Sequence, residues 1–288
     1  MTNFNKVFVT VSDINYIDYT KALFVSAKID GEWDGDFVVV FPEEEKELYD
    51  FKELKDRGVK IHFVKNLPNN KLPHFYKIYL LDEYFKQWDW IFYTDLDCIF
   101  FNKIELNLES KSKLKLYANK EVNFSVVEHF VGNTTEESDA PLFECQNKDE
   151  IKKIIETDFG DGEAFQTCFL LFNSDIIDKK YFNLLYDCYM KYFIEYEMTG
   201  YPGLHDQALY NIVFYNKWEN LGEKFINSYP PLVQNNWQIE MFKNNFYDEN
   251  NYDDVIALHF TNYFQPWKKN NLRFYPIWNE RRNNFYEI

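Results

Sequence analysis

Residues 90–97 read Trp-Ile-Phe-Tyr-Thr-Asp-Leu-Asp, and this stretch decides the fold class that the sequence predicts. Residues 90–94 form an apolar run that is typical of a strand buried on both faces inside a parallel sheet. In open α/β sheets, ligands bind beyond the carboxyl ends of the strands, which is where Asp95 and Asp97 follow. Residues two apart point the same way in an extended chain, so both carboxylates could reach one cation while Leu96 turns into the core.

The Asp-x-Asp motif allows two other interpretations. Aspartate is common in turns, and the motif alone is weak. An apolar strand followed by Asp-x-Asp also begins the haloacid-dehalogenase-type phosphatases, in which the first Asp is a nucleophile. That motif usually lies near the N-terminus and continues with Thr or Val, whereas here it starts at Asp95 and Ile99 occupies that place. The phosphatase is therefore the less favoured interpretation.

Upstream of this stretch, apolar runs alternate with helical patterns. Short β-branched and aromatic runs predict strands, and apolar residues at helical spacing predict helices between them. The predicted strands are Lys6–Val11, Phe37–Phe41 and Val59–Val64. The predicted helices are Tyr19–Ile29, Glu43–Arg57 (ended by Gly58) and Phe75–Phe85. This rhythm favours an α/β fold with a parallel sheet covered by helices, and residues 1–102 have the pattern of a nucleotide-binding half.

Downstream of residue 102 the pattern is less regular. We predict strands at Asn119–Val127, Phe165–Asn173 and Val255–Phe260, and helices at Lys148–Thr157, Tyr181–Glu197 and Asp206–Tyr215. A polar loop is expected at Val131–Glu137. Because there is no internal repeat and no low-complexity linker, we expect one domain over residues 1–288.

Composition and charge narrow the class of protein. The net charge is −16, which disfavours a nucleic-acid binder because such proteins need dense Lys and Arg against phosphates. Aromatic residues make up 20% of the chain, so some are expected in the core and some along a ligand groove. The four cysteines form no C-x-x-C pair, which excludes zinc-ribbon and thioredoxin-type sites. With no signal-peptide pattern and no membrane-span pattern, the sequence predicts a soluble, cytoplasmic protein.

A third metal ligand is suggested far downstream, in residues 259–267. His259 ends the apolar run 255–258, and an imidazole suits manganese better than magnesium. The alternative is a histidine whose hydrogen bonds are satisfied in the core or at the surface. With five histidines in the chain, position alone does not decide between the two.

Four blocks of the sequence resemble the family 8 retaining glycosyltransferases, the group of glycogenin and the bacterial lipo-oligosaccharide galactosyltransferases. Residues 8–16 match the family's opening strand and Asp-x-Asn-Tyr loop, and Asp95-Leu96-Asp97 matches its metal motif. Asp206-Gln207 matches its Asp-Gln pair. Residues 259–267 match His-x-x-Gly-x-x-Lys-Pro-Trp, with His, Pro and Trp in register. Each block is weak alone, but together they follow the family's order along nearly the whole chain.

The resemblance implies a GT-A fold, with a Rossmann-like, mainly parallel sheet flanked by helices and Asp-x-Asp at a strand end. Residues 1–102 would form the nucleotide-binding half, residues 103–267 the donor-sugar and acceptor half, and residues 268–288 a C-terminal tail. The implied activity is metal-dependent, retaining transfer of a hexose from a UDP-sugar to a hydroxyl of a glycan, lipid-linked or protein acceptor. The resemblance is also compatible with a homodimer.

Roles for individual residues also follow from the resemblance. Asp95, Asp97 and His259 would hold manganese or magnesium. Asp206 would bind sugar hydroxyls or orient the acceptor, and Gln207 would lie on the face of the sugar where a nucleophile would sit. The UDP-sugar would contact Val11, Asp13, Asn15, Lys77, Leu96, Gln166, Thr167 and Lys268. Two of these residues have structural alternatives, because Asp206 could cap a helix and Lys77 could be a solvated helix charge.

Three departures from the family pattern concern the donor. Asn262 stands in place of Gly, and Gln265 in place of a Lys that contacts the diphosphate, a charge that Lys268 or Lys269 could supply. Residues 165–168, Phe-Gln-Thr-Cys, stand where the family usually has Phe-Asn-Ser/Ala-Gly, which leaves the sugar open. These departures motivate a second hypothesis, a non-catalytic relative that binds a nucleotide-sugar or a glycan. The acceptor is also open, since its expected loops, 130–144 and 248–254, carry aromatics and carboxylates that suit several acceptors.

Overall fold

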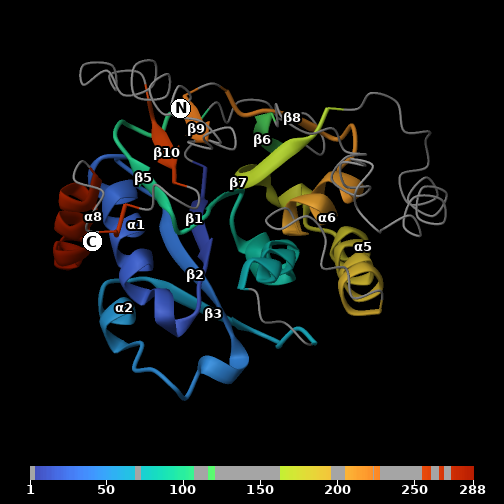
Figure 1. Ribbon diagram of the computed structural model, residues 1–288, viewed down its shortest axis with the longest axis horizontal. Coiled ribbons are helices and arrows are strands. Elements are labelled where there is room, and N and C mark those ends of the chain that lie inside the picture. Colours follow the sequence, from blue (N-terminus) through green and yellow to red (C-terminus); the bar gives the residue numbers. More distant parts are fainter. Residues whose placement is uncertain are drawn as a thin grey trace, which may run out of the picture. The chain divides into compact units, whose positions relative to one another are not determined.

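The computed structural model describes residues 4–68, 73–106, 116–120, 163–195, 205–222, 224–227, 255–260, 266–268 and 274–288. Their larger sheet has the strand order β3-β2-β1-β4-β7-β6-β8, and a smaller sheet has the order β5-β10-β9 (Figure 1). The larger sheet consists of β1 (Lys6–Val11), β2 (Asp36–Pro42), β3 (Lys60–Val64), β4 (Trp90–Thr94), β6 (Leu116–Lys120), β7 (Phe165–Asn173) and β8 (Trp218–Asn220). The smaller sheet consists of β5 (Cys98–Phe100), β9 (Phe225–Asn227) and β10 (Ala257–His259). The predicted α/β class, with a mainly parallel sheet and flanking helices, is confirmed.

The chain divides into two compact units. The first unit comprises residues 1–6, 64–92 and 112–221, and the second comprises residues 7–63, 93–111 and 222–288. The single domain expected over residues 1–288, with its divisions at residues 102 and 267, stays a prediction.

The second unit is built on the parallel pair β1 and β2, whose register sets Phe8 beside Phe37. The ring of Phe8 is fully buried. Its centroid lies 5.6–5.9 Å from the ring centroids of Phe24, Trp33, Phe37 and Phe100. Aromatic pairs at such separations add stability beyond the area they bury. Part of the high aromatic content is therefore core, as predicted.

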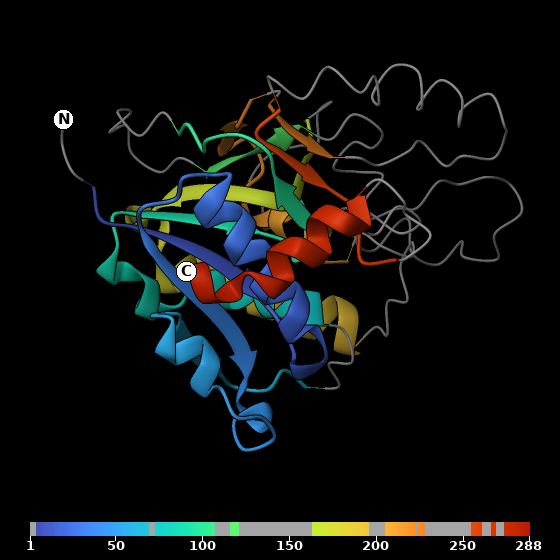
Figure 2. The same ribbon diagram turned by 90° about the vertical axis from the view of Figure 1, so that its left-hand side faces the viewer.

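The C-terminal segment of the second unit is packed. Helix α8 (Phe274–Asn283) lies beside α1 (Ile17–Ile29), as the red and blue helices show in Figure 2. The guanidinium of Arg281 donates two 2.8 Å hydrogen bonds, from Nε and Nη2, to the carboxylate of Asp30. Arg57 donates to the backbone carbonyl of Tyr286 over 2.7 Å. The two parallel hydrogen bonds between Arg281 and Asp30 fix the orientation of α8 against α1.

The first unit contains β7, which pairs antiparallel with β6, while β8 pairs parallel with β6. Its described helices are the 3₁₀ helices η3 (Pro73–Leu81), η4 (Glu83–Gln87) and η5 (Ser174–Ile176), the α-helices α5 (Lys179–Tyr189) and α6 (His205–Val213), and the π-helix η6 (Met190–Glu195). Helix α6 packs on β7 and on η3. This packing brings the start of α6 close to the beginning of β7, and both positions carry predicted site residues.

The predicted helix Glu43–Arg57 is wrong over most of its length. This segment contains only a 3₁₀ turn, η2 (Glu43–Glu45), and the short helix α2 (Lys52–Asp56). Adjacent glutamates repel one another, and Leu48 is 66% exposed, so the first half has no apolar face to bury. Gly58 follows α2 with a φ of +76°, a left-handed conformation that favours glycine and ends the helix as predicted.

Other predicted elements differ in type or extent. Residues 75–85 form the 3₁₀ helices η3 and η4 instead of one α-helix, and they are separated at Asp82, whose carboxylate accepts a hydrogen bond from the backbone N–H of Tyr84 over 2.8 Å. Helix α5 passes at Met190 into a π-helical segment, Met190–Glu195, and β10 is shorter than predicted. The predicted loop 131–137, the predicted helix 148–157 and residues 121–127 lie outside the described residues.

Candidate functional site

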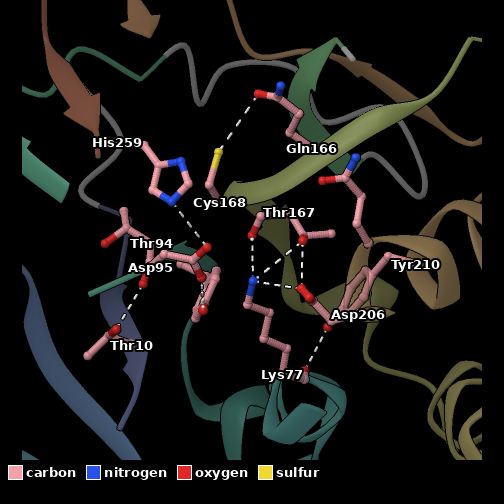
Figure 3. Close-up of polar contacts among 12 residues, drawn as sticks. Thr10, Lys77, Thr94, Asp95, Gln166, Thr167, Cys168, Asp206, Tyr210 and His259 are labelled. Carbon is pink, nitrogen blue, oxygen red and sulfur yellow. Dashed lines mark hydrogen bonds and ion pairs between the residues drawn. The ribbon is translucent and has the colours of Figure 1, made fainter. Parts of the chain in front are cut away.

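A cluster of two carboxylates and one imidazole lies in the second unit, and Figure 3 shows two of its members, Asp95 and His259. Nε2 of His259 lies 2.9 Å from Oδ1 of Asp97 and 3.6 Å from Oδ2 of Asp95. The ligand atoms of the three residues all lie within 4.8 Å of one another. Strand β10 creates this proximity by pairing antiparallel with β5, because the register sets His259 opposite Cys98. The backbone N–H of Phe260 then donates to the carbonyl of Asp97 over 2.7 Å.

The carboxylates converge in a different way from the one predicted. Strand β4 ends at Thr94, and the chain turns at Leu96 and Asp97 instead of staying extended. Leu96 is consequently half-buried and does not enter the core, which corrects the prediction for that side chain. The end of β4 is held by Thr10, whose hydroxyl donates to the carbonyl of Thr94 over 2.8 Å, and Tyr93 donates its hydroxyl to Asp95.

The residues of this cluster suit a divalent cation. Two carboxylates and an imidazole form a mixed oxygen and nitrogen ligand set that manganese accepts readily and magnesium less so. The carboxylates of Asp95 and Asp97 are 23% and 24% exposed, so part of the coordination shell would be open to a ligand. The imidazole of His259 is 8% exposed and therefore fixed by its surroundings.

The loop after β1 is also ordered by its own polar groups. The carboxylate of Asp13 accepts a hydrogen bond from the backbone N–H of Asn15 over 2.7 Å, and its carbonyl accepts one from Tyr16 over 3.0 Å. Val11, at the end of β1, and Asp13 are both buried. Asn15 is exposed. This loop therefore presents the side chain of Asn15 to solvent on a backbone that Asp13 holds in place.

Glu45 supports the same loop, although nothing in its charged segment distinguishes it from the neighbouring glutamates. Its Oε2 accepts a hydrogen bond from the backbone N–H of Ile14 over 3.0 Å. Burial, together with the charge of Asp13, raises the pKa of Glu45 to about 7. Such a shift means that the folded environment disfavours the ionised carboxylate.

A buried ion pair lies in the first unit, between η3 and α6 (Figure 3). Nζ of Lys77 lies 2.7 Å from Oδ2 of Asp206, and the hydroxyl of Thr167 donates to the same oxygen over 2.7 Å. Lys77 is 3% exposed, so the alternative of a solvated helix charge is wrong for this residue. Asp206 lies inside the first turn of α6, where its carboxylate contacts Lys77 and Thr167.

The charge state of this pair is set by opposing effects. Burial alone would raise the pKa of Asp206. The Lys77 ammonium, the charge of His74 and hydrogen bonds from Lys77 and Thr167 together hold that pKa below its usual range. The carboxylate of Asp206 is therefore ionised at neutral pH, and it lies buried against a cation that balances its charge.

Asn211 ties α6 to β7, and sequence reasoning did not identify it. Its Oδ1 accepts from the backbone N–H of Phe165 over 2.8 Å, and its Nδ2 donates to the carbonyls of Phe165 and Gln207 over 2.7 and 2.8 Å. These bonds fix the strand and the helix that carry Gln166 and Gln207, both of which are buried. An asparagine among apolar residues of a predicted helix was the only signal in the sequence.

The structure thus brings the predicted residues together in separate groups. Asp95, Asp97 and His259 meet in the second unit, and Lys77, Thr167 and Asp206 meet in the first. Lys268 is described and exposed in the second unit. Lys269, Asn262, Gln265 and the expected acceptor loops lie outside the described residues.

No protein-family model and no curated protein matches this sequence. Solved glycosyltransferase structures share its fold. The apo structure of the bifunctional glycosyltransferase WbbM has a TM-score of 0.59 and 14% identity, over 100% of this chain and 52% of that one. Galactosyltransferase LgtC, in complex with donor and acceptor sugar analogues, has a TM-score of 0.57 and 15% identity, over 96% and 95% of the two chains. GlyE of Streptococcus pneumoniae TIGR4 has a TM-score of 0.57 and 16% identity, over 99% and 64%.

These likenesses define the fold as the GT-A type found in glycosyltransferases. The chain spans about half the length of WbbM and nearly two thirds of GlyE, but almost the whole of LgtC. Among the described residues, no helix is both long and apolar enough to span a membrane.

Proposed function

We propose that the protein is a metal-dependent, retaining glycosyltransferase of the family 8 type, which moves a hexose from a UDP-sugar to a hydroxyl of a glycan, lipid-linked sugar or protein in the cytoplasm. The cluster of Asp95, Asp97 and His259 at the end of β4 carries this proposal. The GT-A fold supports it, because the site lies at the carboxyl end of a central strand, where ligands of such sheets bind. The same fold favours a transferase over the phosphatase alternative. A homodimer is not supported by these comparisons.

Asp95, Asp97 and His259 would hold the divalent ion, manganese or magnesium. When bound, the ion would act as a Lewis acid that neutralises the negative charge developing on the diphosphate leaving group. The protein has a net charge of −16, so it needs such a cation, or a local basic group such as Lys268, to bind an anionic donor.

The nucleotide would lie against the loop after β1. In this proposal, the backbone at Val11 and the side chains of Asp13 and Asn15 contact the uridine, with Leu96 completing the surface. The hydrogen bond from Asn15 N–H to Asp13 holds the loop before any ligand arrives. A preformed loop binds with a smaller entropic cost than one that orders on binding.

The donor sugar would be bound by polar groups of β7 and α6. The ionised Asp206 would accept hydrogen bonds from sugar hydroxyls, and Lys77 and Thr167 would hold its carboxylate in position. Gln166 and Gln207, buried at the adjacent ends of β7 and α6, would complete this surface. A buried, charge-assisted network gives such a site a fixed geometry.

The reaction would proceed on one face of the sugar. An amide such as that of Gln207 is a poor nucleophile, so we favour direct attack by the acceptor hydroxyl from the side of the leaving diphosphate. The bond from the anomeric carbon to the diphosphate oxygen breaks, the bond to the acceptor oxygen forms, and the acceptor proton passes to the diphosphate. A variant of LgtC that replaces an active-site glutamine with glutamate is among the structures with this fold. We take Gln207, the second residue of the Asp206-Gln207 pair, as the corresponding position in this chain.

A UDP-release assay tests the proposed function. Wild-type protein would be assayed with and without Mn²⁺ on UDP-glucose, UDP-galactose, UDP-N-acetylglucosamine and UDP-xylose, beside the variants Asp97→Asn and Asp56→Asn. Asp56 is an exposed aspartate of α2, so its variant controls for the loss of one carboxylate. We expect Mn²⁺-dependent release from one donor, lost in Asp97→Asn and kept in Asp56→Asn. UDP binding without release from any donor would instead point to the non-catalytic relative or to a required acceptor, and absence of UDP binding would contradict the proposal.

A further inference from the structure

A pocket of about 530 Å³ opens in the second unit, between the N-terminal end of α1 and helix α8. Its volume lies within the range of about 300–1,000 Å³ that is usual for small-molecule sites. Five aromatic side chains line it: Tyr19, Tyr49, Trp267, Tyr275 and Trp278. None of these residues belongs to the metal cluster or to the buried ion pair.

The aromatic walls of this pocket are held in place by one another. The ring centroid of Tyr19 lies 4.5 Å from that of Trp267 and 5.5 Å from that of Trp278, and Tyr275 lies 6.3 Å from Trp278. Trp278 is 6% exposed, and the two hydrogen bonds from Arg281 to Asp30 fix the helix that carries it. The pocket is therefore preformed, and a ligand would not have to order it.

The charged groups of the pocket are balanced within it. Arg282 donates to the carboxylate of Asp18 over 3.3 Å and lies 5.5 Å from the ring centroid of Trp278. The positive charge is thus already paired, and Asn15 adds a neutral amide to the lining. A site for a phosphate or another anion would need an uncompensated cation, which this arrangement does not supply. The pocket favours a ligand that is uncharged.

The polar groups require a ligand that also forms hydrogen bonds. Nε1 of Trp278 is buried and has no hydrogen-bond partner in the described part of the structure. Asn15, Asp18 and Arg282 contribute amide, carboxylate and guanidinium groups beside the aromatic rings. Sugars present both an apolar C–H face, which packs on aromatic rings, and hydroxyls, which bond to such polar groups.

We propose that this pocket between α1 and α8 is a binding site for a neutral carbohydrate, which shares only Asn15 with the residues assigned to the donor and none with the metal cluster. The proposal does not depend on transferase activity, because a relative that only binds ligands could have the same site. In an active transferase, the site would hold a distal unit of a glycan and so raise the local concentration of acceptor hydroxyls.

Saturation-transfer-difference NMR tests this proposal on the whole protein without metal, with lactose, maltotriose and N,N′-diacetylchitobiose as probes. The variants Tyr49→Ala and Tyr275→Ala remove partly exposed pocket walls, and Tyr286→Ala removes a tyrosine that is 59% exposed and does not line the pocket. We expect transfer to at least one probe, with affinity about twofold to tenfold weaker in both pocket variants and unchanged in Tyr286→Ala.

A competition arm on the wild-type protein needs no variant and separates this pocket from the donor site. We expect the saturation transfer to persist when UDP and Mn²⁺ are present in excess. Displacement of the probe by UDP would show that the pocket is part of the nucleotide site, and this would overturn the proposal. The proposal would equally fail if none of the three probes received saturation, or if the pocket variants bound as wild type does.

Discussion

The ammonium of Lys77 lies 2.7 Å from the carboxylate of Asp206, and both side chains are buried. The two residues are 129 positions apart in the sequence (206 minus 77), and the packing of α6 on η3 joins them. An ion pair removed from water in this way is costly to break, because the remaining partner keeps its charge without its counterion. This relationship determines both the stability of the first unit and the charge that a ligand would meet there.

Replacement of Lys77 by Met should therefore destabilise the protein strongly. We expect a loss of about 3–5 kcal/mol in the free energy of unfolding, measured by urea denaturation. The matched control is Lys60→Met, which removes the exposed pair between Lys60 and Asp36, where the two side chains are 44% and 40% exposed. That change should cost less than about 1 kcal/mol. Equal losses in the two variants would show that the Lys77 pair is not buried in solution.

The hydroxyl of Thr167 should contribute more to the free energy of unfolding than the methyl group of this side chain does. Thr167→Val keeps the shape but removes the 2.7 Å hydrogen bond to the ionised Asp206, so we expect a loss of roughly 1.5–3 kcal/mol in unfolding free energy. Thr167→Ser keeps the hydroxyl and should retain most of that stability. If Asp206 also binds the donor sugar, kcat/KM for UDP release should fall in the Val variant more than in the Ser variant. The opposite order would argue against a polar role for Thr167.

Glu45 should make stability depend on pH. Its folded pKa of about 7 exceeds the ordinary value of 4.5, so the folded state binds the proton more tightly than the unfolded state. The ionised form therefore costs stability, and this cost grows as the pH rises from about 4.5 to about 7 and then levels off. The effect should be modest, because Glu45 is only half-buried and solvent screens its charge.

The variant Glu45→Gln isolates this contribution, since an amide oxygen can still accept the bond from Ile14 N–H. We expect its Tm to exceed that of wild type at pH 8 by more than it does at pH 5, as measured by differential scanning fluorimetry. Glu47→Gln, which changes an exposed neighbour, controls for the loss of one surface carboxylate. A Tm difference that stays constant across this pH range would contradict the assigned burial of Glu45.

The choice of metal should depend on the imidazole of His259. His259→Asp replaces a nitrogen ligand with an oxygen ligand at the position 2.9 Å from Asp97. Oxygen ligands suit magnesium, whereas imidazole favours manganese, so the ratio of Mn²⁺-supported to Mg²⁺-supported UDP release should fall. Parallel assays with each ion would give this ratio. An unchanged ratio would place His259 outside the coordination shell.

The sequence predicted those parts of the fold that local patterns specify. Strands β4 and β7 have the predicted bounds, because continuous apolar runs with clear ends require a buried strand. The predicted helix over residues 43–57 was wrong, because such a charged segment forms a stable helix only when it buries an apolar face. Leu48 would belong to that face, and it is exposed. The alternation of side chains in an extended strand also predicted that Leu96 points into the core. The chain turns at Leu96, so this prediction was wrong.

For the candidate site, the local patterns and the family resemblance predicted which residues take part. They did not predict the contacts that hold these residues in place. Asp95, Asp97 and His259 were predicted and do meet, since strand ends and register bring them together. Glu45 and Asn211 were missed because their roles arise from hydrogen bonds to the backbone of Ile14 and Phe165, which lie 31 and 46 positions away. Contacts of this kind depend on tertiary packing, which a single sequence does not display.

The central claim, that Asp95, Asp97 and His259 form a metal site used with a nucleotide, is tested most directly by electron paramagnetic resonance of Mn²⁺. The six-line signal of free Mn²⁺ would be followed during titration with the protein in the presence of UDP. We predict that the wild-type protein removes the signal with a stoichiometry of one ion per chain, and that Asp97→Asn does not. Persistence of the free-ion signal with wild-type protein and UDP would contradict the account.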